Sequence, residues 1–98
     1  MTSNGYTALK DAVLALCTDT GLVARLEHAH IALARIDAEA DLPESLRFRF
    51  EELLADIAYG ADAVTDALVR MSAPDRERLA SRVVGLFDEA LRLMPTDA

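Results

Sequence analysis

The chain has 98 residues, of which 52% are hydrophobic, and a net charge of −7; this length predicts one domain over 1–98, with flexible ends at 1–5 and 95–98. One lysine and nine arginines against 17 acidic residues argue against direct nucleic-acid binding, because neutralising phosphates requires clustered basic side chains. The single cysteine excludes an internal disulfide, and no apolar run approaches the roughly 20 residues of a membrane helix, so we expect a cytoplasmic protein without membrane contact.

Apolar residues recur at helical spacing along the chain, and no segment alternates as a half-buried strand would. This pattern predicts an all-α protein, folded as a compact antiparallel up-and-down bundle of four to five helices. The first helix is predicted over 6–17, with Cys17 as a small core residue. The second is predicted over 22–37, where apolar residues repeat in steps of four and three.

A third helix is predicted to begin after Asp41, whose side chain can accept hydrogen bonds from exposed amides, and to include Pro43, which has no amide hydrogen to leave unpaired. The apolar stripe keeps its register through Gly60, so that 44–71 would make one helix about 42 Å long. Glycine costs about 1 kcal/mol inside a helix, and so long a helix would overshoot the second one. We therefore predict a break near Gly60.

The negative charge is concentrated in this middle third. Residues 37–69 contain nine acidic and two basic residues, whereas the segments before and after contain equal numbers of both. The net charge therefore belongs to one folded segment, which indicates a polarised surface. Such a surface favours encounter with a basic partner.

The last helix is predicted to begin at Ser72-Ala-Pro-Asp75, which has the pattern of a helix cap, and to end at Met94-Pro95. It carries two adjacent apolar stripes, which begin at Leu79 and Ala80. Its apolar face is therefore wider than that of an ordinary surface helix. We interpret it as a central helix or as a helix shared with another subunit.

Two large apolar residues, Phe48 and Ile31, each lie about 160° around the helix from the apolar stripe of their own helix. One interpretation is that a five-helix packing buries both of them. The other is that they mark a homodimer interface.

Arg25 and His30 are separated by four residues on the second predicted helix. This spacing resembles the catalytic motif of HEPN ribonucleases, which are small all-helical dimers. The resemblance implies that Arg25 and His30 would cleave RNA at a cleft between two subunits. The alternative is a solvent-facing helix on which both are ordinary surface residues.

Other chemistry has less support. Glu27 and His30 form Glu-x-x-His, half of a di-iron motif, but a full site needs two such pairs and two more glutamates, and the chain has two histidines. We therefore expect no metal and no cofactor. Four arginines bracket the start of the last helix, where interleaved acids favour surface pairing over anion binding: Arg70, Arg76, Arg78 and Arg82.

The run from Leu42 to Glu51 reads Leu-Pro-Glu-Ser-Leu-Arg-Phe-Arg-Phe-Glu, and Met71-Ser72 and Leu79-Ala80 follow it. These elements resemble those of short bacterial all-helical proteins that carry an L-P-E-x-L-R-x-x-F-E element and a Met-Ser turn before the last helix. The resemblance implies the helical layout and assigns no activity.

The sequence as a whole favours a non-enzymatic interaction or regulatory subunit, homodimeric, that presents its acidic third to a protein partner, which we expect to be basic. The alternative function is a HEPN-like ribonuclease that uses Arg25 and His30. The predicted interaction surface comprises Phe48, Arg47, Arg49, Ile31, Glu51, Glu52 and Asp56.

Overall fold

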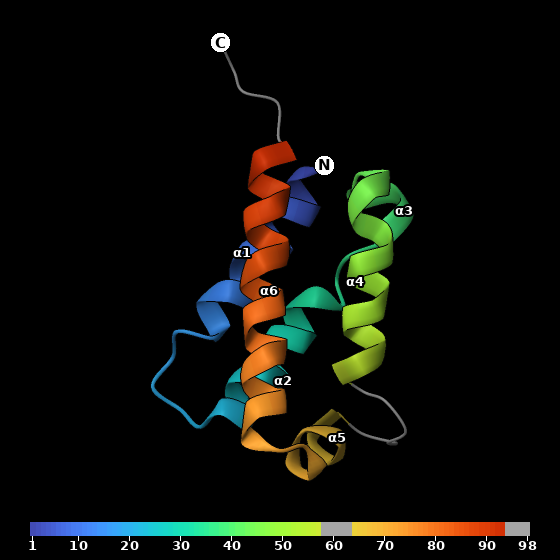
Figure 1. Ribbon diagram of the computed structural model, residues 1–98. Coiled ribbons are helices and arrows are strands. Elements are labelled where there is room, and N and C mark those ends of the chain that lie inside the picture. Colours follow the sequence, from blue (N-terminus) through green and yellow to red (C-terminus); the bar gives the residue numbers. More distant parts are fainter. Residues whose placement is uncertain (58–63, 94–98) are drawn as a thin grey trace.

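The computed structural model describes residues 1–57 and 64–93, which contain six α-helices and no strand. The all-α prediction is confirmed. In Figure 1, α6 stands in front of α1 and α2, with α4 beside it and α5 below. The helices are α1 (Ser3–Ala15), α2 (Leu22–Leu33), α3 (Ala38–Asp41), α4 (Glu44–Ile57), α5 (Val64–Arg70) and α6 (Ala73–Leu93).

One cluster of buried side chains joins the longer helices. The predicted stripe of α4, from Leu46 to Ile57, is buried in it. So is the first stripe of α6, from Leu79 to Ala90. The second stripe of α6 is half in solvent, since Val84 is 46% exposed and Leu91 is 44% exposed. One side of α6 is therefore buried in the core, and the adjacent side is partly exposed to solvent.

The N-terminal residues are fastened to the fold, although the sequence predicts a flexible segment there. The hydroxyl oxygen of Thr2 accepts a hydrogen bond from the Gly5 amide at 3.0 Å and caps α1, which therefore begins at Ser3 and not near Tyr6. The same hydroxyl donates to Asp41 Oδ1 at 2.7 Å, and Asn4 Nδ2 donates to Asp41 Oδ2 at 2.8 Å. These bonds join the start of α1 to the end of α3.

The prediction that Asp41 caps the third long helix is wrong. Its side chain is 8% exposed and accepts hydrogen bonds from Thr2 and Asn4 and, at 2.9 Å, from the Asp37 amide. The Asp37 amide, together with Thr2 and Asn4, lowers the pKa of Asp41 below its ordinary value of 3.8. Asp41 therefore stays charged while it ties α1 to the turn before α3.

The second helix ends at Leu33, four residues before the predicted end at Asp37. Asp37 instead caps α3, because its Oδ1 accepts from the amides of Glu39 at 3.1 Å and Ala40 at 3.4 Å. The one-turn helix α3 was not expected. Arg47, on α4, donates hydrogen bonds to the carbonyl oxygens of Ala38 and Glu39 in this helix.

Other boundaries follow the sequence more closely. The α6 cap is confirmed, since Ser72 Oγ accepts from the Asp75 amide at 3.3 Å.

Cys17 is exposed, and its assignment to the core is wrong. The predicted break at Gly60, the end of the last helix at Met94-Pro95 and the tail at 95–98 lie outside the described residues. No helix in the described part of the chain has both the length and the apolar character to cross a membrane.

Candidate interaction surface

The predicted surface centres on Phe48, which lies on the solvent side of α4 and is 72% exposed. Glu44, Glu51 and Glu52 are exposed on the same helix. They lie four residues before, three after and four after Phe48, so helical spacing places their carboxylates around its ring. We call these four residues, Glu44, Phe48, Glu51 and Glu52, the acidic face of α4.

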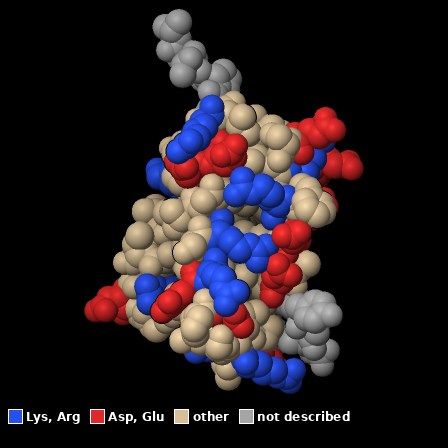
Figure 2. Space-filling model, in the orientation of Figure 1, with Lys and Arg blue, Asp and Glu red and all other residues tan. Residues whose placement is uncertain are grey.

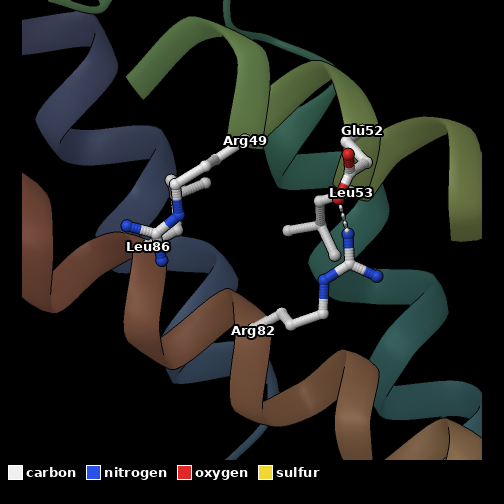
Figure 3. Close-up of a pocket in the computed structure, with 5 residues that line it drawn as sticks. All are labelled: Arg49, Glu52, Leu53, Arg82 and Leu86. Atoms are coloured by element: carbon white, nitrogen blue, oxygen red, sulfur yellow. Dashed lines mark ion pairs between the residues drawn. The ribbon is translucent and has the colours of Figure 1, made fainter. Parts of the chain in front are cut away.

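The two arginines that flank Phe48 in the sequence turn away from this face. Arg47 Nε donates to the carbonyl oxygens of Ala38 at 3.1 Å and Leu42 at 3.2 Å, and its Nη2 donates to that of Glu39 at 3.0 Å. The guanidinium of Arg49 extends toward Leu86 of α6 (Figure 3). The acidic face therefore presents an aromatic ring among carboxylates, without the basic charge that Arg47 and Arg49 suggested.

Arg82 of α6 links its helix to α4. Its Nη1 donates to Asp56 Oδ2 at 2.8 Å, and its Nη2 lies 3.6 Å from Glu52 Oε1, an ion pair drawn in Figure 3. Arg82 and Glu52 border a small groove of about 100 Å³ over Leu53 and Leu86. Asp56, predicted as a partner contact, is therefore occupied within the chain. Glu44 and Glu51 form no ion pair within residues 1–57 and 64–93.

A second groove, of about 520 Å³, lies between α5 and the start of α6. Arg70, Arg78 and Arg82 line it together with Asp56 and Asp75. Arg78 pairs with Asp75 at 3.0 Å, as the interleaved charges predict. Basic and acidic side chains accordingly lie next to one another along the boundary of α6 with α4 and α5 (Figure 2). The groove offers an anion little net positive charge.

Phe48 and Ile31 are both exposed, Ile31 by 65%. The interpretation in which helix packing buries both residues is therefore wrong. Ile31 lies on α2, and it lines none of the grooves found within residues 1–57 and 64–93. The homodimer interpretation of these residues stays a prediction.

Arg25 and His30 lie on one helix, α2, and both are half-buried. Arg25 Nη1 donates to the Leu16 carbonyl oxygen at 3.2 Å, which ties the start of α2 to the end of α1. Burial lowers the pKa of His30 below 6.5, so its neutral form is favoured. Neither observation adds support for RNA cleavage, and the ribonuclease alternative stays a prediction.

Neither a metal-binding geometry within residues 1–57 and 64–93 nor a known relative points to another site. In the ranges 1–57 and 64–93, no three His, Cys, Asp or Glu side chains are placed to hold a metal ion together. Comparison with protein-family models, with curated proteins and with solved structures finds no match for this chain. The chemistry of the acidic face of α4 is therefore the best guide to function.

Proposed function

We propose that this protein is a non-enzymatic interaction or regulatory subunit of the cytoplasm, homodimeric, which binds a basic partner protein through the acidic face of α4. The observation that carries the proposal is the exposed ring of Phe48 among Glu44, Glu51 and Glu52. Buried aromatic side chains contribute much of the energy at protein interfaces. Surrounding charge increases the association rate and orients the partner.

The composition of the acidic face of α4 also indicates the chemistry of the partner that would fit it. A phenyl ring needs an apolar pocket, and the carboxylates around it need lysine or arginine at the rim of that pocket. Glu44 and Glu51 are available for such contacts, because they pair with no described residue. The exposed second stripe of α6, with Val84 and Leu91, supports the homodimer separately.

Selection of peptides from a random display library tests this proposal without a known partner. Peptides retained by the wild-type protein are expected to combine an apolar anchor with several lysines or arginines. Their affinity should fall between about 50 mM and about 500 mM salt, because exposed charges are screened over this range. The affinity is measured by fluorescence polarisation of the selected peptides.

Two variants locate the binding. Phe48→Ala is expected to weaken the binding of the selected peptides by more than about 1 kcal/mol, as for an interface anchor. Val69→Ala, which truncates another exposed apolar residue on a different helix, is the matched control and should bind as the wild type does. Neutral or acidic selected peptides, or equal binding by Phe48→Ala, would contradict the proposal.

A further inference from the structure

Four exposed residues of α4 form one line along the helix. Glu44, Phe48, Glu51 and Ala55 follow one another in steps of four, three and four residues, and all four are exposed. These steps are the spacing with which one helix presents a seam to a second helix that packs along it. The line alternates acidic and apolar side chains, and we call these four residues the α4 seam.

The two carboxylates of the α4 seam are not paired by their own helix. Arg47 lies three residues after Glu44 and four before Glu51, so helical spacing makes it the nearest basic residue to both. Its guanidinium instead donates hydrogen bonds to three backbone carbonyl oxygens. Neither glutamate forms an ion pair within the ranges 1–57 and 64–93. Both carboxylates are therefore available to cations of a partner.

The acids on the other side of the Phe48 ring are already neutralised in part. Arg82 lies 2.8 Å from Asp56 and 3.6 Å from Glu52, and Figure 3 shows the pair with Glu52. Glu44 and Glu51 lie on the opposite side, about 40° and 60° around the helix from Phe48. The positive charge of a partner is therefore expected along the edge that Glu44 and Glu51 form.

The spacing along this edge favours a helical partner. Glu44 and Glu51 are seven residues apart, which is about 10.5 Å at helical rise. A helix presents its own side chains seven positions apart at the same distance and on one side. A strand presents side chains on one side at about 6.8 Å and about 13.6 Å, so one of its cations would be out of register by at least about 3 Å.

This chain does not contain the complementary helix. No two of its ten lysine and arginine residues are seven positions apart. Its net charge of −7 also opposes the approach of a second copy to an acidic edge. The occupant that fits the α4 seam is therefore a different, basic protein.

We propose that the partner segment is an amphipathic α-helix that packs along the α4 seam and carries two basic residues seven positions apart, with apolar residues at the intervening seam positions. The basic residues lie opposite Glu44 and Glu51. Phe48 inserts between four side chains of the partner helix, and the small side chain of Ala55 leaves room for a large apolar residue. This inference rests on the proposed function and adds the conformation and charge spacing of the partner.

Three synthetic peptides of about 18 residues, about 27 Å as helices, test the proposal. The first is a helix with two arginines seven positions apart on a leucine stripe. The second exchanges one arginine with an alanine two positions away, which turns that charge about 160° around the helix at constant composition. The third replaces a central alanine of the first with proline, which disfavours the helix by about 3 kcal/mol. Fluorescence polarisation is expected to give the second and third peptides a Kd at least about fivefold above that of the first.

Variants of the protein locate the contact. Glu44→Gln and Glu51→Gln should each raise the Kd of the first peptide by about threefold or more. Each should also reduce the preference for the first peptide over the second. Glu77→Gln removes an exposed glutamate from α6 that forms no ion pair in the described ranges, and this matched control should leave both values unchanged. Circular dichroism confirms that each variant is folded.

The outcomes separate this inference from the proposed function. Equal binding of the three peptides, or binding that ignores both Glu44→Gln and Glu51→Gln, would overturn the helical partner. The helical partner would also be overturned if peptides from the display library bind through Phe48 while the first peptide does not bind. In these cases the proposed function stands. If neither the library peptides nor the synthetic peptides bind, the proposed function and this inference fail together.

Discussion

Asp41 shows how one side chain can fix a chain end. Its carboxylate joins residues that are about 40 positions apart in the sequence, through Thr2 and Asn4 at the start of α1. The carboxylate also accepts a hydrogen bond from the backbone amide of Asp37, the residue that caps α3. A charged group with three donors is stabilised in its ionised form, so the fold depends on the pH at which Asp41 takes up a proton.

This dependence gives a prediction for acid unfolding. The folded-state pKa of Asp41 lies below the ordinary value of 3.8, so the unfolded chain binds the proton first as the pH falls. The stability contributed by Asp41 is therefore complete above the unfolded-state pKa and is lost as the pH falls through the folded-state pKa.

Asp41→Asn should lower the free energy of unfolding near neutral pH and flatten its decline in acid, as measured by urea unfolding at a series of pH values. Asp66→Asn, at an exposed position, is the matched control. A decline as steep in Asp41→Asn as in the wild type would assign the acid sensitivity to other carboxylates.

At the scale of the helices, two glycines in helical segments are expected to respond oppositely to alanine. A Cβ on Gly5 would lie 2.7 Å from the Asp41 carbonyl oxygen, whereas a Cβ on Gly85 would meet only Arg49 Nη2, at 4.0 Å. Overpacking at Gly5 costs about 1 to 3 kcal/mol, and replacing glycine within a helix gains roughly 0.5 to 1 kcal/mol.

Gly5→Ala should therefore destabilise the protein, and Gly85→Ala should stabilise it by roughly 0.5 to 1 kcal/mol. Chemical denaturation of both variants beside the wild type measures the two effects. Equal stabilisation by both would show that α1 can move away from Asp41 without cost.

The longer helices could be predicted because each repeats apolar residues over several turns, as α4 does from Leu46 to Ile57. The one-turn helix α3 has no such repeat, and its stabilising contacts include Arg47 from the following helix. Asp41 has the local pattern of a cap, but the start of α1 competes for its carboxylate. The prediction that Cys17 lies in the core was wrong because α1 ends at Ala15, so helical spacing no longer sets the direction of this side chain.

The candidate surface could also be predicted only in part from the sequence. The exposure of Phe48 follows from its angle on the helix, which depends only on the sequence of α4. The directions of Arg47 and Arg49 depend on carbonyls of α3 and on the neighbouring helix α6. No local pattern contains that information.

At the scale of the whole molecule, a net charge of −7 opposes the compact state through self-repulsion. Salt should weaken this repulsion more than it weakens the ion pairs, because those pairs are exposed and contribute roughly 0 to 1 kcal/mol each. The Tm of dilute protein should therefore rise between about 10 mM and about 300 mM sodium chloride, as measured by circular dichroism. A falling Tm would mean that the ion pairs outweigh the repulsion.

The exposed position of the acidic face on α4, beside α6 (Figure 1), has a consequence for how the protein would respond to its partner. A homodimer that leaves α4 uncovered carries two acidic faces, one on each copy. It is then bivalent, and a target with two basic motifs at a suitable spacing would be held about 10² to 10⁴ times more tightly than a target with one. Such a protein would bind tightly where its target is locally dense, and it would bind isolated copies of the target weakly.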